Sequence, residues 1–368
     1  MRHTPLIDRH RAHGAKLVDF AGWEMPIQYG SVVDEYRHVR EAAGLFDVSH
    51  MGRIRVAGEG ALAFLQNMTT NNVAGIPLLG SQYSMVCNPS GGIKDDIFVY
   101  HTKPNEYLVC VNASNRTKIV SWFQEHRPST AVSIHDESET MAQLALQGPA
   151  ASTILQNAGL TDVVSLKPRT ALPVTIRDHG CFISRTGYTG EPGWELYIPS
   201  ALVAAVWDDL LQAGHNADLT PAGLGARDLL RLEMAYLLYG NDISEDTTPL
   251  AANATWVVDF SKGTFVGREA LMDQQRRGLD TILVAFELLE KSVPRHGFRI
   301  LDPASSKAIG EVTSGNLSPL LQKGIGLGYV PASFATPQTA ILIDIRGKTF
   351  PAVTVTPPFY RKSKTMSQ

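Results

Sequence analysis

The sequence has few cysteines and no hydrophobic run long enough to cross a bilayer. Only three of its 368 residues are cysteines, Cys87, Cys110 and Cys181, and they are far apart. Without a Cys-x-x-Cys spacing they exclude a disulfide framework and a zinc site, and they indicate buried thiols in a reducing compartment. A membrane helix needs about 20 apolar residues, and the N-terminus lacks the apolar core of a signal peptide. We therefore expect a cytoplasmic protein that does not enter the membrane.

The sequence also lacks an excess of either charge. Lysine and arginine total 33 and aspartate and glutamate 36, a formal net charge of −3. Nucleic-acid-binding domains are usually basic, so we expect no nucleic-acid partner. With 44% hydrophobic residues the composition is that of a folded globular protein. At roughly 100–200 residues per domain, the length indicates two or three domains.

Hydrophobic periodicity predicts helices and strands that are interleaved without a βαβ rhythm. A first helix is expected between an N-cap at Ser31 and a stop at Gly44. Further helices are expected at 61–68, 115–125, 149–158, 201–213, 223–238 and 267–275, and strands at 97–100, 107–111, 141–146, 173–176, 181–184 and 195–198. After about residue 278 only strand patterns remain, at 281–288, 298–301, 307–313, 340–345 and 352–355. The fold class is therefore α+β, followed by an all-β C-terminal domain.

Two adjacent carboxylates follow a Gly-Gly turn at the start of a predicted strand. Because strand side chains alternate, Asp95 and Asp96 should point to opposite faces, so that one of them can enter a pocket. The alternative is an ordinary polar turn that begins a strand. The other spaced oxygen ligands of a calcium loop are missing, so the pair does not predict a metal site.

A glycine-rich segment, 185–195, contains three glycines and a proline and predicts a tight loop. It is not a phosphate loop, because it has no Gly-Lys-Ser/Thr. Tyr188, Trp194 and Glu195 would supply stacking surface and an acceptor for a flat heterocycle that bears N–H donors. The alternative is a hairpin turn with packing aromatics.

The predicted helix at 223–238 carries two arginines, Arg227 and Arg231, on one polar edge, with Asp228 beside the second. Guanidinium groups near a pocket suit a carboxylated ligand. The alternative is an amphipathic helix with surface ion pairs. His50 follows Ser49 directly, which makes the two poor catalytic partners, so we interpret His50 as structural.

Taken in order, the motifs of this chain resemble those of one family, the glycine cleavage system aminomethyltransferases (T-proteins). The resemblance covers nearly the whole chain, and its motifs are Val18-Asp19-Phe20-Ala21-Gly22-Trp23, Gly44-Leu45-Phe46-Asp47-Val48-Ser49-His50-Met51, Gly91-Gly92-Ile93-Lys94-Asp95-Asp96, Leu146-Gln147-Gly148-Pro149, Thr186-Gly187-Tyr188-Thr189-Gly190-Glu191, Gly225-Ala226-Arg227-Asp228, Tyr239-Gly240-Asn241-Asp242-Ile243, Val312-Thr313-Ser314-Gly315 and Gly328-Tyr329-Val330-Pro331. The resemblance implies three domains in a cloverleaf around a central folate channel. Their expected boundaries are 1–48 with 139–245 for the first α+β domain, 49–138 with 246–277 for the second, and 278–368 for a barrel or jelly-roll-like β domain.

The resemblance also implies an activity and its partners. The enzyme would take the aminomethyl group from the lipoyl arm of H-protein, pass its methylene carbon to tetrahydrofolate and release ammonia, with no metal. Asp96 would be the catalytic carboxylate. The residues that would bind the folate are Met51, Tyr83, Tyr100, Asn112, Tyr188, Glu195, Arg227, Tyr236 and Arg361.

Two other functions stay open on the same scaffold. A free-standing folate-dependent demethylase shares these motifs, although the oxidases of that group carry a flavin domain for which this chain has no room. The non-enzymatic folate-binding protein of iron–sulfur cluster assembly has a cysteine in a motif that here reads Lys262-Gly263-Thr264-Phe265. Thr264 occupies the cysteine position, so the thiol is absent.

Overall fold

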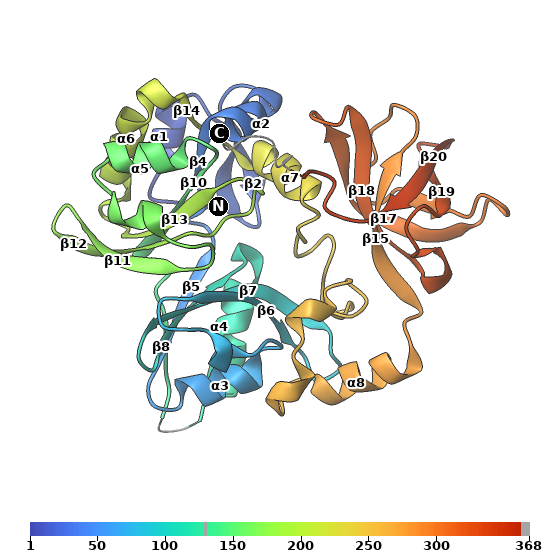
Figure 1. Cartoon of the computed structure of the whole chain (residues 1–368), viewed down its shortest axis with the longest axis horizontal. Coiled ribbons are helices and arrows are strands. Elements are labelled where there is room, and N and C mark those ends of the chain that lie inside the picture. The colour runs from blue at the N-terminus through green and yellow to red at the C-terminus, as the bar shows by residue number, and fades with distance from the viewer. Residues whose placement is uncertain (129–130, 362–368) are drawn as a thin grey trace. The chain divides into compact units, whose positions relative to one another are not determined.

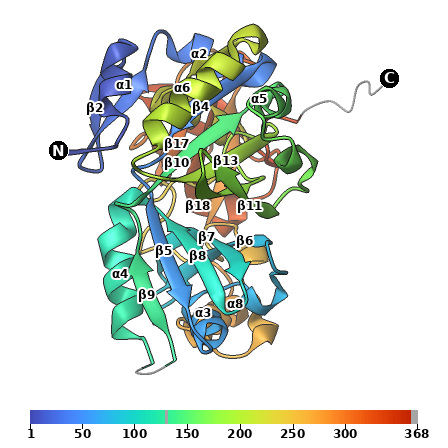
Figure 2. The same ribbon diagram turned by 90° about the vertical axis from the view of Figure 1, so that its left-hand side faces the viewer.

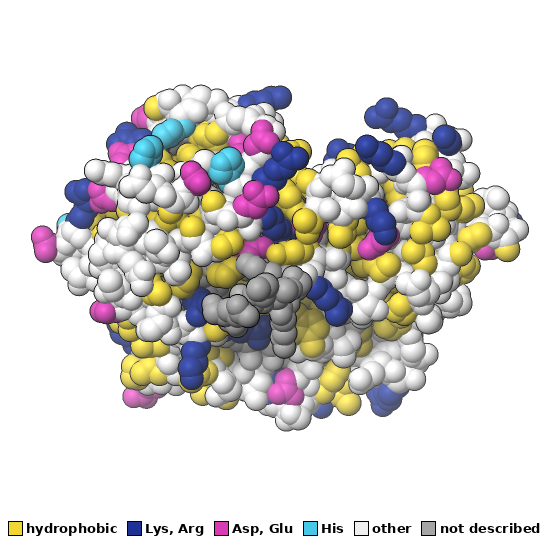
Figure 3. All heavy atoms as spheres, turned by 45° about the horizontal axis from the view of Figure 1, so that its top comes forward, with side chains coloured by type: hydrophobic (Ala, Val, Ile, Leu, Met, Phe, Trp, Pro, Cys, Tyr) yellow, Lys and Arg dark blue, Asp and Glu magenta, His cyan; other side chains and the backbone are white. Residues whose placement is uncertain are grey.

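The computed structural model describes residues 1–128 and 131–361, and the chain divides into two compact units. The first comprises Met1–Arg227 and Trp256–Arg268, and the second comprises Asp228–Thr255 and the chain from Glu269 onward. Side chains of both charges are interspersed on the face shown in Figure 3, which agrees with the small net charge. In the described ranges, no helix combines the length and the apolar character needed to cross a bilayer.

The helices and strands alternate along the first unit, and strands dominate the second (Figure 1). The helices are α1 (Ile7–Ala12), α2 (Val32–Glu41), α3 (Ala61–Met68), α4 (Arg116–Glu125), α5 (Ala151–Asn157), α6 (Val203–Ala213), α7 (Leu224–Glu233) and α8 (Arg268–Arg277). The strands of the first unit are β1 (Arg2–His3), β2 (Lys16–Phe20), β3 (Trp23–Gln28), β4 (Ala43–Asp47), β5 (Gly52–Ala57), β6 (Ser81–Cys87), β7 (Ile93–Lys103), β8 (Glu106–Val111), β9 (Ser133–Asp136), β10 (Met141–Gln147), β11 (Ala171–Ile176), β12 (His179–Ser184), β13 (Gly193–Pro199) and β14 (Leu219–Pro221). Those of the second unit are β15 (Thr281–Leu288), β16 (Arg299–Leu301), β17 (Ala308–Ser318), β18 (Lys323–Pro331), β19 (Ala340–Ile345) and β20 (Lys348–Val355).

The first unit contains three sheets. A six-stranded sheet has the order β11-β12-β13-β10-β4-β14, a five-stranded sheet the order β6-β7-β8-β5-β9, and a small sheet the order β1-β3-β2. Helix α4 lies along the five-stranded sheet (Figure 2), where Ile119 and Phe123 join Phe64 and Leu65 of α3 in one buried cluster. The sheet is thus covered on the face that carries its apolar side chains, as the alternating strand pattern requires.

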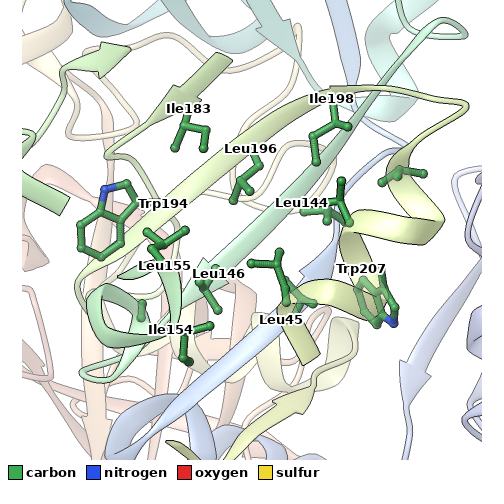
Figure 4. Packing of buried hydrophobic residues seen from close by; sticks show 14 of the residues in the cluster. Leu45, Leu144, Leu146, Ile154, Leu155, Ile183, Trp194, Leu196, Ile198 and Trp207 are labelled. Atoms are coloured by element: carbon green, nitrogen blue, oxygen red, sulfur yellow. The ribbon is translucent and has the colours of Figure 1, made fainter. Parts of the chain in front are cut away.

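The core of the six-stranded sheet is formed by aliphatic side chains between two tryptophans (Figure 4). Trp194 of β13 and Trp207 of α6 are both buried, and Leu144 of β10 packs in the same cluster. The indole N–H of Trp194 donates to the carbonyl of Val163 at 2.9 Å, so the ring carries no unpaired donor into the core. Burial of each such side chain contributes roughly 1.5–3 kcal/mol, which makes this sheet a firm base for the loops at its ends.

The second unit is built on a closed six-stranded barrel with the order β15-β18-β17-β16-β19-β20. Strand β18 was not among the predicted strands, because glycine at every second position, Gly324, Gly326 and Gly328, lowers its strand propensity. The barrel supplies the reason for these glycines. A Cβ on Gly326 would lie 2.5 Å from the ring of Phe286, so close packing inside the barrel excludes a side chain there.

The α+β class and the C-terminal barrel are confirmed, while two predicted helix ends are wrong. The helix predicted after Ser31, α2, ends at Glu41, and Gly44 lies inside the buried strand β4, where a Cβ would meet Val39 at 2.4 Å. The helix predicted to reach residue 238 ends at Glu233, because Ala235 adopts a left-handed φ of 54°. The cloverleaf arrangement and the three domain boundaries stay predictions from the resemblance.

Candidate active site

Strand β7 carries both aspartates of the Gly-Gly turn, and the strand pattern explains their different surroundings. Asp95 lies in register with the buried Ile97 and Val99, on the side of β7 that packs into the core. Asp96 is only half-buried. The alternation of strand side chains therefore separates one interior carboxylate from one that is accessible to a ligand.

Asp96 is held at both carboxylate oxygens. The hydroxyl of Tyr83, on the neighbouring strand β6, donates to Oδ2 at 2.9 Å. The amide nitrogen of Asn112, directly after β8, donates to Oδ1 at 2.7 Å. Burial and the neighbouring Asp96 charge raise the pKa of the Tyr83 hydroxyl well above its usual value, so this hydroxyl remains a donor. These two neutral donors fix the orientation of the carboxylate.

Asp95 orients the same asparagine from behind. Its carboxylate accepts from Asn112 at the backbone N–H (3.0 Å) and the side-chain amide (2.8 Å), and from the amide of Asn115 at 2.6 Å. Burial and the nearby charge of Asp96 raise the pKa of Asp95 above its usual range. The Nδ2 group of Asn112 therefore bridges the carboxylates of Asp95 and Asp96.

A second acidic group, Glu195 on β13, sits in a network of hydroxyl and amide donors. Thr186 donates to Oε2 at 2.5 Å and Tyr100 to the same oxygen at 3.3 Å, while the amide of Gln143 reaches Oε1 at 3.4 Å. Tyr100 is fully buried and also accepts from the hydroxyl of Tyr197 at 3.0 Å. Glu195 is therefore a fixed acceptor, suited to N–H donors of a bound heterocycle.

A row of aromatic rings joins these two groups along β7. The ring of Trp256 is stacked on that of Tyr83 with centroids 5.5 Å apart, Tyr83 lies 6.0 Å from Phe98, and Phe98 lies 5.7 Å from Tyr100. Phe98 and Tyr100 follow Asp96 at intervals of two residues and so share its face of the strand. Trp256 is 63% exposed, although it is a large apolar side chain. This arrangement places a row of aromatic rings between the two carboxylates.

Arg227 near the start of α7 and Tyr188 of the glycine-rich loop form a cation–π pair. The guanidinium carbon lies 4.7 Å from the centre of the tyrosine ring. Burial lowers the pKa of Arg227, opposed by its attraction to Tyr188 and Glu195, and the group stays a cation at neutral pH. Met51 is held through its carbonyl by the buried guanidinium of Arg53.

With this geometry established, comparison with known proteins identifies the family. Residues 6–262 match the family model of the GCVT N-terminal domain, and residues 282–361 match that of the Glycine cleavage T-protein C-terminal barrel domain. The chain belongs to the glycine cleavage T-protein family.

Relatives in the T-protein family match over their full lengths. An aminomethyltransferase of Halothermothrix orenii is 45% identical over 359 residues, which cover 98% of this chain and 100% of the relative. One from Chloroherpeton thalassium is 44% identical and covers 99% of this chain and 100% of its own. The crystal structure of glycine cleavage system aminomethyltransferase T from Bartonella henselae matches with a TM-score of 0.91 and 32% identity over 98% of each chain. The resemblance deduced from the motifs is confirmed.

The residues that the T-protein resemblance assigns to folate binding fall into both units. The first unit brings together Asp96 with Tyr83 and Asn112, Glu195 with Tyr100, and Arg227 with Tyr188. Tyr236 and Arg361 belong to the second unit and are partly and largely exposed, respectively. The guanidinium of Arg361 lies 3.5 Å from the carbonyl of Pro357, and the backbone N–H of Tyr236 donates to the carbonyl of Arg231 at 3.0 Å.

Two side chains of the predicted ligand-binding segments turn out to be structural. Trp194 belongs to the core rather than to a stacking surface. Arg231 is buried and donates to Asp242 at 2.8 Å, to Ser314 at 2.8 Å and to the carbonyl of Tyr236 at 3.0 Å. Arg231 therefore fixes the chain after α7, and it also forms the predicted i,i+3 ion pair with the partly exposed Asp228 at 2.7 Å.

Several residues of this network were missed by sequence reasoning. Gln143 gave a usable signal, because a glutamine inside the otherwise apolar strand Met141–Leu146 has to find hydrogen-bond partners. Thr186 stood in a recognised motif without an assigned role. Trp256 gave no local signal, since Tyr83, on which its ring stacks, is far away in the sequence. Only the tertiary fold reveals that pair.

His50 and the cysteines are buried side chains, as the interpretation of them as structural residues requires. His50 is buried, and burial lowers its pKa to about 3. All three cysteines are free and buried. In the part of the chain that the structure describes, no group of three or more His, Cys, Asp or Glu side chains is placed to hold a metal ion.

Proposed function

We propose that this chain transfers the methylene carbon of the aminomethyl group on lipoylated H-protein to tetrahydrofolate, producing 5,10-methylenetetrahydrofolate and ammonia. The observation that carries the proposal is the accessible carboxylate of Asp96, held by Tyr83 and Asn112 at one end of an aromatic face that reaches Glu195. Membership of the T-protein family supports the choice of donor and acceptor. The cytoplasmic location expected from the sequence goes with this proposal.

The folate would be recognised by complementary polarity. The pterin ring presents N–H donors, for which Glu195 is a fixed acceptor, and its flat faces suit the aromatic surface formed by Tyr83, Phe98 and Trp256. Arg227 supplies a cation for the electron-rich part of the ligand or its carboxylates. Tyr100 is buried against Glu195, so in this proposal it acts by holding that acceptor. We assign the remaining contacts to Met51, Asn112, Tyr188, Tyr236 and Arg361.

The chemistry needs orientation and a negative charge more than a protein nucleophile. Cleavage of the C–S bond leaves its electron pair on the lipoyl sulfur and forms an iminium cation. A folate amine attacks its carbon, the aminomethyl nitrogen leaves as ammonia after protonation, and the second folate amine closes the methylene bridge. Asp96 would stabilise the positive charge that develops in these steps and hold the folate amines in line. It can also relay a proton between them.

The direct test is an ammonia-release assay with aminomethylated H-protein and tetrahydrofolate. We expect ammonia and methylenetetrahydrofolate in equal amounts, and omission of either substrate should return the rate to its uncatalysed level. No ammonia above the uncatalysed rate would refute the proposal. A free-standing demethylase without an oxidant would instead transfer an intact methyl group from its donor and form 5-methyltetrahydrofolate without H-protein and without ammonia, so identifying the folate product separates the two functions.

A further inference from the structure

Gln147, the last residue of β10, reaches from the core of the six-stranded sheet into the glycine-rich loop. Its side chain is fully buried. The amide nitrogen donates to the carbonyl of Thr186 at 3.2 Å, and the amide oxygen accepts from the hydroxyl of Thr189 at 2.9 Å. A buried amide that lost these partners would be costly, so the two bonds fix one orientation of the side chain and one position of the loop.

Two glycines of the loop leave room for this amide. A Cβ on Gly187 would lie 2.0 Å from Oε1 of Gln147, and a Cβ on Gly193 would lie 2.2 Å from its Nε2. Neither glycine has a φ in the left-handed region, so their backbone conformations are open to other residues. Glycine is therefore required at these two positions because Gln147 approaches the backbone closely, and not because the chain turns there.

The segment held in this way carries two parts of the site. Thr186 donates to Glu195 at 2.5 Å, and the ring of Tyr188 lies against Arg227. The other side of the segment is held by Arg40 of α2, which donates to the carbonyl of Thr189 at 2.7 Å. The loop is thus fixed between β10 and α2. The positions of Thr186 and Tyr188 depend on the position of this loop.

We propose that Gln147 is a positioning residue for folate recognition. It acts without touching the ligand, by holding Thr186 against the Glu195 acceptor and Tyr188 against Arg227. The inference rests on the proposed function, because the ligand it concerns is tetrahydrofolate. Replacing Gln147 should affect folate binding, because the contacts that it fixes surround Glu195, which recognises the heterocycle. Asp96, the carboxylate assigned to the chemistry, is not among these contacts.

The test uses Gln147→Met, which keeps the length of the side chain and removes both hydrogen bonds. We expect the dissociation constant for tetrahydrofolate, measured by calorimetry, to rise about tenfold, because part of the binding free energy would then be spent on ordering the loop. The KM for tetrahydrofolate should rise in parallel, with kcat within about twofold of wild type. Gln124→Met is the control, because Gln124 also donates to a backbone carbonyl, that of Ile134 at 3.2 Å, but on α4.

A second variant approaches the same contact from the loop. Gly187→Ala should weaken folate binding in the wild-type background and have little further effect once Gln147 is replaced by alanine, since the clash then disappears. Unchanged folate affinity in folded Gln147→Met and Gly187→Ala proteins would overturn the inference. An equal loss of folate affinity on Gly187→Ala substitution, with Gln147 present and with Gln147 replaced by alanine, would also overturn it. Failure of the wild-type protein to bind tetrahydrofolate would instead refute the proposed function.

Discussion

The phenolic hydroxyl of Tyr83 donates a 2.9 Å hydrogen bond to Oδ2 of Asp96 across two neighbouring strands. This bond connects the half-buried carboxylate to the aromatic face, since the same tyrosine ring stacks on Trp256. In the proposed function Tyr83 is therefore both a surface for the folate and a support for the carboxylate. These two roles can be separated by experiment.

Replacement Tyr83→Phe keeps the ring and removes the hydroxyl. A hydrogen bond to a charged group is worth roughly 1.5–3 kcal/mol, so we expect kcat for ammonia release to fall by about tenfold or more. The dissociation constant for tetrahydrofolate should change by less than about threefold, because the stacking surface remains. Tyr107→Phe is a suitable control, since the Tyr107 ring stacks on His101 elsewhere in the sheet. A Tyr83→Phe enzyme with wild-type kcat would show that the hydroxyl does not support Asp96.

Glu195→Gln tests the recognition end of the site. The substitution keeps the size of the side chain but replaces one acceptor oxygen by a donor, facing Thr186 or the ligand. We expect the dissociation constant for tetrahydrofolate to rise by about 10- to 100-fold, in line with roughly 1.5–3 kcal/mol for a charge-assisted bond. Equilibrium titration of the Glu195→Gln protein with tetrahydrofolate measures this dissociation constant. Asp209→Asn, which removes only an exposed ion pair with Arg177, should bind folate as wild type does.

The structure also predicts how stability depends on pH through His50. Burial lowers the pKa of this residue from 6.5 to about 3 in the folded protein. Above pH 6.5 both folded and unfolded forms are neutral and the protein has its full stability. As the pH falls from 6.5 towards 3 only the unfolded chain takes up this proton, so stability is lost at up to about 1.4 kcal/mol per pH unit.

The variant His50→Gln should therefore lose stability less steeply than wild type between pH 6 and pH 4. Urea unfolding at several pH values measures the difference between the two slopes. His179→Gln provides the control, because His179 is an exposed residue of β12. Parallel pH profiles for wild type and His50→Gln would contradict the assignment of His50 as a buried neutral group.

In the barrel, Gly310→Ala should be destabilising. A Cβ at this position of β17 would lie 1.8 Å from the carbonyl oxygen of Tyr329 on β18, and a backbone atom in a closed sheet cannot move aside easily. Overpacking of this kind costs about 1–3 kcal/mol. Thermal denaturation should show a lower Tm for Gly310→Ala than for Gly180→Ala, where the added Cβ has no neighbour within 4 Å. Equal Tm values would mean that the barrel can relax around the extra methyl group.

The sequence was sufficient for elements whose determinants are local. Helix α3 and strand β15 lie at the predicted residues, because apolar spacing alone defines them. Strand β18 could not be predicted in the same way. Its alternating glycines are favourable only because Phe286 of the adjacent strand β15 fills the space beside Gly326, and that neighbour is known only from the fold.

The candidate site shows the same division. The motifs located Asp96 and Glu195 and, through the family resemblance, their proposed roles. They did not reveal that Asn112 joins Asp95 to Asp96, or that Gln147 supports the glycine-rich loop. Each of these contacts joins side chains from different strands or loops. Sequence spacing carries no information about such distances, whereas strand register and loop packing determine them.

The most direct test of the account compares wild type with Asp96→Asn in a single turnover with H-protein carrying a ¹³C-labelled aminomethyl group. Tetrahydrofolate binding to both proteins is measured in parallel by calorimetry. We predict that wild type transfers the label to methylenetetrahydrofolate and releases ammonia. Asp96→Asn should bind folate with an affinity close to that of wild type but transfer the label at least about 100-fold more slowly. This slower transfer corresponds to a loss of roughly 2.7 kcal/mol of transition-state stabilisation. Transfer by Asp96→Asn at the wild-type rate, or a loss of folate binding as large as the loss of rate, would contradict the central claim that this carboxylate orients the reacting amines and stabilises positive charge.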